Sequence, residues 1–141
     1  MTAPADGVAV SGVVGIGVDA VDVERFRTVI SRRPAVLERL FTDAERAFAG
    51  AMSDPGPRLA ARFAAKEAVL KALGVGIGAA GFRDVEVVRE RDGAPRLALS
   101  GRAATLADRR GVRRWHVSLT HTDLVAVASV VAEGAPGTVP P

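Results

Sequence analysis

The segment RFAAKEAVLKALG, residues 62–74, places a carboxylate where an apolar side chain is expected. Its composition predicts a helix, and Phe63, Glu67 and Leu70 then fall on one stripe of that helix. Because an unpaired carboxylate on an apolar stripe is costly, Glu67 needs a proton, an arginine or a divalent cation to offset its charge. An ion pair with Lys71, one helical turn later, is the structural alternative.

Two lysines flank this glutamate. Lys66 and Lys71 are the only lysines in the chain, and the other strongly basic side chains are arginines. A lysine ammonium is a compact charge that suits a phosphate group, and its pKa can fall far enough for it to move protons. The two lysines therefore favour a chemical role for the residues around Glu67.

Asp19 is the second candidate carboxylate. The segment GIGVDA, residues 15–20, matches the G-x-G-x-x-A fingerprint of dinucleotide-binding turns. We reject that interpretation, because Asp19 would lie inside the anion-binding turn and repel a pyrophosphate, and no βαβ unit follows. Gly15 and Gly17 instead indicate close backbone approach on a strand, with Asp19 emerging at its C-terminal end as a metal ligand. The alternative is that Asp19 caps the next helix.

A polar ladder is predicted within HVSLTHTD, residues 116–123. In a strand, His116, Ser118 and Thr120 point to one face, and the residues between them point to the other. Such side chains are suitable donors for phosphate or ribose oxygens. A solvated face of an edge strand is the alternative, and a zinc site is not predicted because no His/Cys set with suitable spacing exists elsewhere.

Arg25 and Arg27 lie on the predicted first helix, near Phe26 and Ile30. They are candidates for docking an acidic helical partner protein. A basic, solvated helix face is the alternative.

The composition limits the classes of partner. With 141 residues, 48% hydrophobic and 25% charged, the chain fits one soluble globular domain. The net charge of +3 favours an anionic partner, but the dense basic tract and interleaved aromatics of a nucleic-acid binder are missing. Absent cysteine fits a reducing cytoplasm, and neither a signal peptide nor a membrane-spanning run is visible. We therefore expect a cytoplasmic protein with no nucleic-acid or membrane partner.

The elements expected around these residues are one strand, several helices and then mostly strands. Strands are predicted over 12–19, 82–90, 96–100, 115–123 and 124–132, and helices over 22–31, 34–40, 57–73 and 101–111, with a further helix opening at the capping box 42–45. This order favours an α+β fold with an antiparallel sheet. We expect one domain over 12–132, a flexible N-terminal extension over 1–11 and a flexible C-terminal tail over 133–141.

Together, these segments resemble the phosphopantetheinyl transferases of the short holo-[acyl-carrier-protein] synthase type, from about Val14 to Val131. GIGVDAVDVERFR resembles the opening G-I-G-x-D segment of that family, with a basic residue, Arg25, six positions after the aspartate. RFAAKEAVLKALGVGIG resembles its central K-E-A-x-x-K-A-x-G signature and the following glycine loop. HVSLTHT resembles its closing strand.

The resemblance implies a phosphopantetheinyl transferase-like α+β fold, in which an antiparallel sheet packs against a long central helix and shorter helices. It also implies transfer of the 4′-phosphopantetheine arm of coenzyme A (CoA) to a serine of an apo acyl carrier protein. Asp19 and Glu67 would hold Mg²⁺ against the CoA pyrophosphate, and Lys71 would contact the phosphate near the reacting centre. Further candidate CoA ligands are Arg62, Lys66, His116, Ser118, Thr120 and the backbone of Gly74 and Gly76. The base for the serine proton would be a metal-bound water or Glu67, with Lys71 as the alternative.

The resemblance further implies that the carrier protein docks at Arg25 and Arg27, and that the chain forms a homotrimer with each site shared between two subunits. His116 would then serve a neighbour's Asp19 and Glu67. Two other functions compete with the transferase. One is a CoA or nucleotide sensor, which would not need the whole metal set. The other is a structural trimer-forming domain, in which the polar residues serve as caps and salt bridges.

Overall fold

The structure is a computed structural model that describes residues 11–136. The helices are α1 (Val23–Arg32), α2 (Val36–Leu40), α3 (Asp43–Gly50), α4 (Gly56–Ala72), the 3-10 helix η1 (Phe82–Asp84) and α5 (Gly101–Arg109). The strands are β1 (Ser11–Asp22), β2 (Val85–Arg89), β3 (Pro95–Leu99), β4 (Val112–His121) and β5 (Val125–Pro136). The predicted N-terminal extension up to residue 10 and residues 137–141 of the predicted tail lie outside the described residues.

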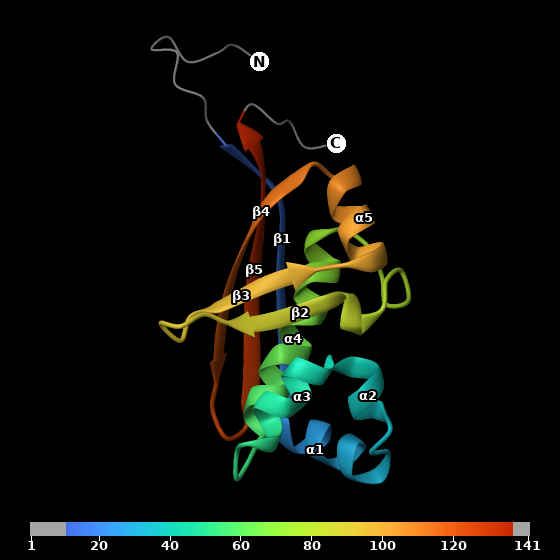
Figure 1. Ribbon diagram of the computed structural model, residues 1–141, viewed down its shortest axis with the longest axis vertical. Helices are drawn as coiled ribbons and strands as arrows, with labels where there is room; N and C mark the ends of the chain where they lie inside the picture. Colours follow the sequence, from blue (N-terminus) through green and yellow to red (C-terminus); the bar gives the residue numbers. More distant parts are fainter. Residues whose placement is uncertain (1–10, 137–141) are drawn as a thin grey trace.

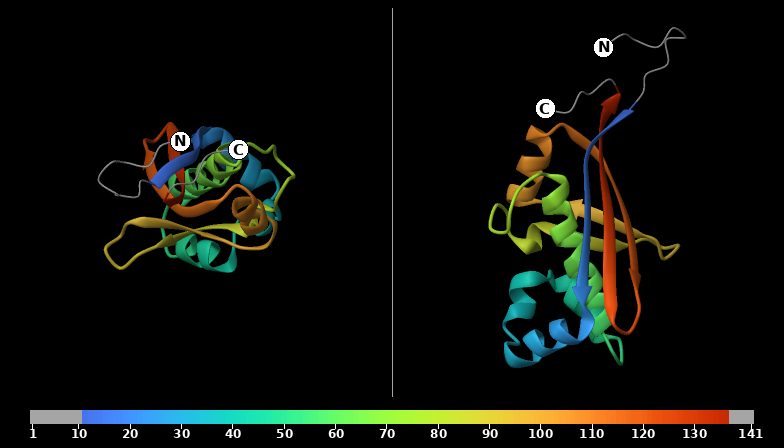
Figure 2. Two further views of the ribbon diagram at one scale, coloured as in Figure 1. Left: turned by 90° about the horizontal axis from the view of Figure 1, so that it is seen from above. Right: turned by 180° about the vertical axis from the view of Figure 1, so that it is seen from behind.

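Three long strands form an antiparallel sheet in the order β1-β5-β4, and β2 and β3 form a separate antiparallel hairpin. Figures 1 and 2 show the three-stranded sheet along one side of the molecule, with α4 against it and the hairpin crossing on the other side of that helix. No described helix is long and apolar enough to span a membrane. The fold is therefore α+β with an antiparallel sheet on a long central helix, as the sequence predicts.

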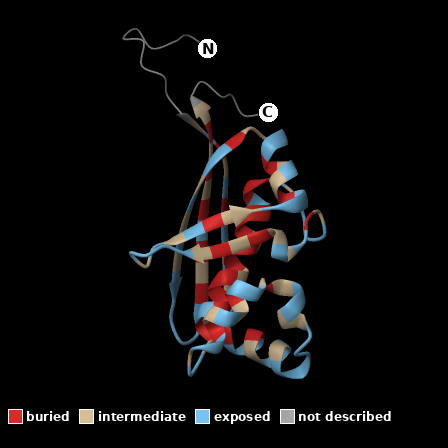
Figure 3. Ribbon diagram, in the orientation of Figure 1, coloured by how far each residue is buried: buried red, intermediate tan, exposed pale blue. Residues whose placement is uncertain are grey.

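Helix α4 is the buried centre of the molecule, as Figure 3 shows. Its face toward the sheet is lined by alanines, including Ala64, Ala68 and Ala72, which have almost no exposed surface. Small side chains let β1 approach so closely that a Cβ atom added at Gly17 would lie 1.9 Å from the Ala68 carbonyl oxygen. A Cβ atom at Gly15 would lie 2.1 Å from the Ala72 oxygen. The prediction of close backbone approach at these two glycines is confirmed.

Two helix starts follow the capping rules. Asp22 is the N-cap of α1, and its carboxylate accepts a hydrogen bond from the Arg25 amide at 2.8 Å. Thr42 and Glu45 form the predicted reciprocal capping box at the start of α3. Because Asp22 provides the α1 cap, Asp19 is not needed for that role.

Several expected boundaries are wrong, including the following three. Strand β1 continues past Asp19 to Asp22, so Asp19 lies within the strand and not at its end. The first three residues of the expected strand 82–90 form η1 instead. Residues 133–136 belong to β5 and not to the tail, because they pair with the neighbouring strands; Glu133, for example, lies opposite Val13.

Candidate functional site

Asp19 and Lys71 are joined across the contact between β1 and α4. The ammonium of Lys71 donates to Asp19 Oδ1 at 2.9 Å and to the Val18 carbonyl oxygen at 3.0 Å. Residues 15, 17 and 19 share the face of β1 that packs on the helix, because side chains alternate along a strand. The close contact at Gly17 therefore sets the depth at which the Asp19 carboxylate meets α4.

Glu67 lies one turn before Lys71 on the same helix and is half-buried. Burial raises the pKa of the Glu67 carboxyl above its usual value, the negative charge of Asp19 raises it further, and Lys71 opposes both. Within residues 11–136, Lys71 forms its ion pair with Asp19 and not with Glu67. The helical pair that was the structural alternative for Glu67 is therefore not formed, and two carboxylates compete for one ammonium.

A cleft of about 690 Å³ opens beside the two carboxylates. Asp19, Glu67 and Arg25 line it together with apolar side chains of α1, α2, α4, the glycine loop and η1. Those apolar residues include Phe26, Val29, Val36, Leu40, Phe63 and Phe82. The structure thus brings three of the predicted site residues, Asp19, Glu67 and Lys71, to one place, with Arg25 beside the same cleft.

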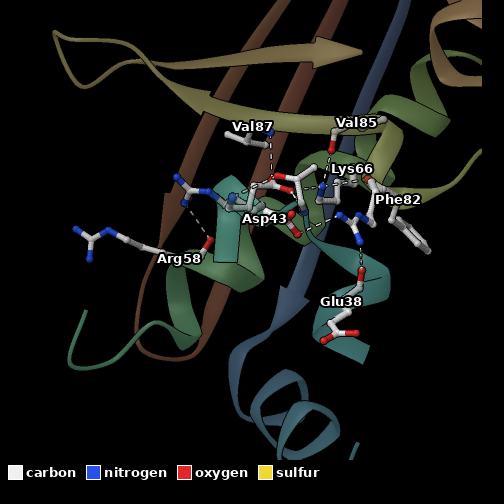
Figure 4. A network of polar contacts seen from close by, with 11 residues as sticks. Glu38, Asp43, Arg58, Lys66, Phe82, Val85 and Val87 are labelled. Atoms are coloured by element: carbon white, nitrogen blue, oxygen red, sulfur yellow. Dashed lines mark hydrogen bonds and ion pairs between the residues drawn. The ribbon is translucent and has the colours of Figure 1, made fainter. Parts of the chain in front are cut away.

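The prediction that Lys66 contacts a CoA phosphate is contradicted by its burial. Lys66 has 0% exposed surface, and Figure 4 shows its ammonium among the polar groups of neighbouring elements. It donates to Glu45 Oε1 at 2.7 Å, to the Phe82 carbonyl oxygen at 3.0 Å and to the Val85 carbonyl oxygen. These three bonds use all three N–H groups of the ammonium, so Lys66 joins α4 to α3, η1 and β2 as a core residue.

Arg62 faces a different hollow from the carboxylates. It is only 5% exposed and its guanidinium lies over the Phe48 ring, 4.2 Å from the centroid. With Ser118 it lines a basic pocket of about 310 Å³, which we call the arginine pocket. Its other polar side chains are those of Arg58, Arg89 and His121. No residue lines both this pocket and the cleft.

The sequence did not single out Arg58, Arg89 or His121. His121 could have been found from strand alternation, which places it on the opposite face of β4 from His116. Arg58 could have been found from helical spacing, because it lies one turn before Arg62 on α4. Arg89 enters the pocket only through the packing of the hairpin.

The side chains of the predicted ligands on β4 lie on the outer surface of the sheet. His116, Ser118 and Thr120 are exposed on one face of β4, as the ladder predicted. The imidazole Nε2 of His116 lies 3.6 Å from a carboxylate oxygen of Glu133 on β5. This face does not meet the Asp19–Glu67 cleft within one chain.

The glycine loop is largely exposed, and the two predicted docking arginines differ in their contacts. Gly74 and Gly76 are exposed, and Gly74 has φ +69°, a conformation suited to glycine. Arg25 is free to face the cleft, whereas Arg27 donates to Glu24 and to Asp54, both at 2.6 Å. The Arg27 charge is therefore offset within the chain, which weakens the prediction that it docks a partner.

Comparisons with a family model, with related sequences and with solved structures all point to the same protein family. A family model described as the 4′-phosphopantetheinyl transferase superfamily matches residues 15–128. A holo-[acyl-carrier-protein] synthase of Frankia alni is 51% identical over 86% of this chain and 98% of its own length. A crystal structure of a holo-(acyl-carrier-protein) synthase from Bacillus anthracis, in complex with CoA (3′,5′-ADP), is 33% identical and covers 89% of this chain and 100% of its own, with a TM-score of 0.74. That of the Neisseria meningitidis synthase is 31% identical, covers 86% and 98%, and has a TM-score of 0.79.

Proposed function

The chain belongs to the 4′-phosphopantetheinyl transferase superfamily, and we propose that it acts as a holo-[acyl-carrier-protein] synthase. It transfers 4′-phosphopantetheine from CoA to a serine of apo acyl carrier protein and releases adenosine 3′,5′-bisphosphate. The observation that carries this proposal is that Asp19, Glu67 and Lys71 lie together beside a largely apolar cleft.

The two carboxylates fit a divalent cation. Burial and then the negative charge of Asp19 raise the pKa of Glu67, and Lys71 offsets only part of this effect. Residues 11–136 contain no group of three or more His, Cys, Asp or Glu residues arranged to hold a metal. A metal held by two carboxylates, with its remaining ligands from substrate phosphates and water, is the pattern typical of Mg²⁺. When bound there, Mg²⁺ would neutralise the CoA pyrophosphate.

In the proposed reaction, the serine oxygen bonds to the phosphorus that carries pantetheine. The bond from that phosphorus to the bridging oxygen breaks, and adenosine 3′,5′-bisphosphate leaves with the electron pair. Lys71 supplies a positive charge next to the pyrophosphate, because its side chain is 54% exposed and its ammonium lies beside Asp19. Glu67, which lines the cleft beside Asp19, is the candidate acceptor for the serine proton.

The arginine pocket is suited to the second anionic end of CoA, its 3′-phosphate. Arg58, Arg62 and Arg89 line it together with His121. The pocket and the cleft share no lining residue, so a CoA molecule that used both within one chain would have to pass around α4. Two adjoining subunits would allow one CoA to use the cleft of one and the pocket of the other, which supports the shared sites of the expected homotrimer.

The outer face of the three-stranded sheet is the surface we propose for this assembly. Ile16 and Val18 on β1 are 70% and 59% exposed there. Ile16 lies opposite Val131, which in turn lies opposite His116 on β4. Burying such apolar surface between subunits is favourable. It would also bring His116 to a neighbouring chain.

The cleft is the proposed docking surface for the acyl carrier protein. Arg25 lies on its rim, and Phe26 and Val29 continue it as an apolar surface along α1. A helix with acidic residues beside an apolar face would match both features.

Intact-protein mass spectrometry of apo acyl carrier protein incubated with the protein, CoA and Mg²⁺ tests the proposal. We expect the carrier to gain the mass of one phosphopantetheine, and the gain to vanish with EDTA and return with added Mg²⁺. Glu67→Gln should lower turnover more than about tenfold, a loss above about 1.4 kcal/mol of transition-state stabilisation. Glu38→Gln, which removes an exposed carboxylate outside the cleft, is the matched control. Wild-type protein that binds CoA without transfer would favour the sensor function. Full activity in EDTA would refute the proposed metal requirement.

A further inference from the structure

Phe48 on α3 holds two of the three guanidinium groups of the arginine pocket. The guanidinium carbon of Arg62 lies 4.2 Å from the ring centroid, and that of Arg89 lies 5.3 Å from it. Both distances are within the range in which a cation over an aromatic face is attracted. Arg89 is held a second time at the hairpin turn, where its Nε donates to the Gly93 carbonyl oxygen at 3.3 Å.

The three arginines of this pocket have no acidic ion-pair partner within the described residues. Several arginines outside the pocket, such as Arg25, also lack one, but these three line a single pocket. Within the described part of the chain, Arg27, Arg46, Arg83 and Arg96 each form an ion pair, whereas Arg58, Arg62 and Arg89 form none. The Nε atom of the buried Arg62 also has no hydrogen-bond acceptor among those residues. Burial lowers the pKa of Arg62, and the nearby charges of Arg89 and Arg58 lower it further, while Glu45 opposes them. The pocket therefore gathers three positive charges that no ion pair within the described residues neutralises.

An aromatic ring and a carboxylate hold a guanidinium in different ways. A carboxylate orients the group through paired hydrogen bonds and neutralises it. An aromatic face orients it through its quadrupole, leaving the N–H donors and the full charge free for a third group. Two planar forks on the same ring, with their charge intact, suit a doubly charged phosphate monoester.

We propose that Phe48 is a positioning residue for anion binding, which sets Arg62 and Arg89 to receive the 3′-phosphate monoester of CoA. This proposal rests on the proposed function for the identity of the ligand. Elements α3, α4 and β2 converge at this ring, so the ring determines whether the enzyme distinguishes CoA from its analogue without the 3′-phosphate. Phe48 itself touches no substrate and acts through the two arginines.

The test compares CoA with 3′-dephospho-CoA in wild type, Phe48→Leu and Phe48→Tyr, with full-length protein. Leucine keeps the apolar bulk but removes the aromatic face, whereas tyrosine keeps the face. For Phe48→Leu we expect the KM for CoA to rise about tenfold with kcat unchanged, since two cation–π contacts are lost. The KM for 3′-dephospho-CoA should stay unchanged, and Phe48→Tyr should behave like wild type. Isothermal calorimetry with adenosine 3′,5′-bisphosphate, in the absence of carrier protein, should show the same loss of affinity.

The outcomes distinguish a failure of the proposed function from a failure of the proposed role of Phe48. If wild type binds adenosine 3′,5′-bisphosphate but does not transfer, the proposed function fails, and calorimetry of the variants still decides the role of Phe48. An equal effect of Phe48→Leu on both CoA analogues, or none on either, overturns the proposal. If Phe48→Leu lowers the unfolding temperature markedly, Phe48→Met replaces it, because methionine adapts its shape to the core and also lacks an aromatic face. The proposal predicts the same selective loss for CoA, and an unselective loss would refute it.

Discussion

The contact between Gly17 and α4 gives the sharpest prediction about the site. A Cβ atom at Gly17 would lie 1.9 Å from the Ala68 oxygen, 2.8 Å from its carbonyl carbon and 3.0 Å from the Ala72 nitrogen. These are backbone atoms of a buried helix, so no side-chain rotation relieves the overlap. Gly17→Ala must therefore move β1 away from α4 by about 1 Å.

That displacement acts directly on the proposed catalytic groups. Asp19 is two residues along the same face of β1, and its partner Lys71 is on the helix from which the strand would be displaced. A misplacement of about 1 Å can lower a rate about 100-fold, which corresponds to about 2.7 kcal/mol of barrier. Overpacking should also cost about 3 kcal/mol of unfolding free energy.

Urea unfolding and the transfer assay measure the two effects separately. The assay should be run at a temperature where circular dichroism shows the variant to be folded. Gly50→Ala is the matched control, because a Cβ atom there meets nothing within 4 Å, and it should leave both quantities nearly unchanged. A Gly17→Ala protein with more than about a third of the wild-type rate, and with unfolding free energy within about 1 kcal/mol of wild type, would refute the reasoning.

Two further predictions concern charged groups. Lys66→Met should lower the unfolding free energy by about 3–5 kcal/mol because it leaves Glu45 buried without its cation. The double variant Glu45→Gln, Lys66→Met should recover at least about 1 kcal/mol of that loss, and urea unfolding that shows equal stability for both would contradict this account. Arg25→Glu should raise the KM for the carrier protein about tenfold with little change in the KM for CoA, since it reverses a charge on the cleft rim. Steady-state kinetics with each substrate varied in turn would decide this, with Arg32→Glu at the far end of α1 as the control, and an unchanged carrier KM would remove the docking role.

The local pattern of the sequence was sufficient for the fold class and for singling out Asp19 and Glu67, which the structure brings together. Capping residues, alternation and the long alanine-rich helix are local features, and each predicts its element from neighbours within a few positions. The glycines of GIGVDA predicted close approach because only a residue without a side chain allows it. Asp19 and Glu67 could be singled out because a carboxylate in an apolar pattern needs a compensating charge.

Tertiary packing alone decided which polar residues are free to act. Lys66 and Lys71 have the same chemistry and lie five residues apart, yet their different angular positions on α4 make one a core residue and the other an exposed cation. The partners of Lys66 come from α3, η1 and β2, which the sequence separates by up to 21 residues from it. Arg89 joins Arg62 only because the hairpin crosses α4 beside Phe48. Long-range contacts of this kind leave no periodic trace in the sequence, because they depend on how separate elements pack and not on the spacing within any one of them.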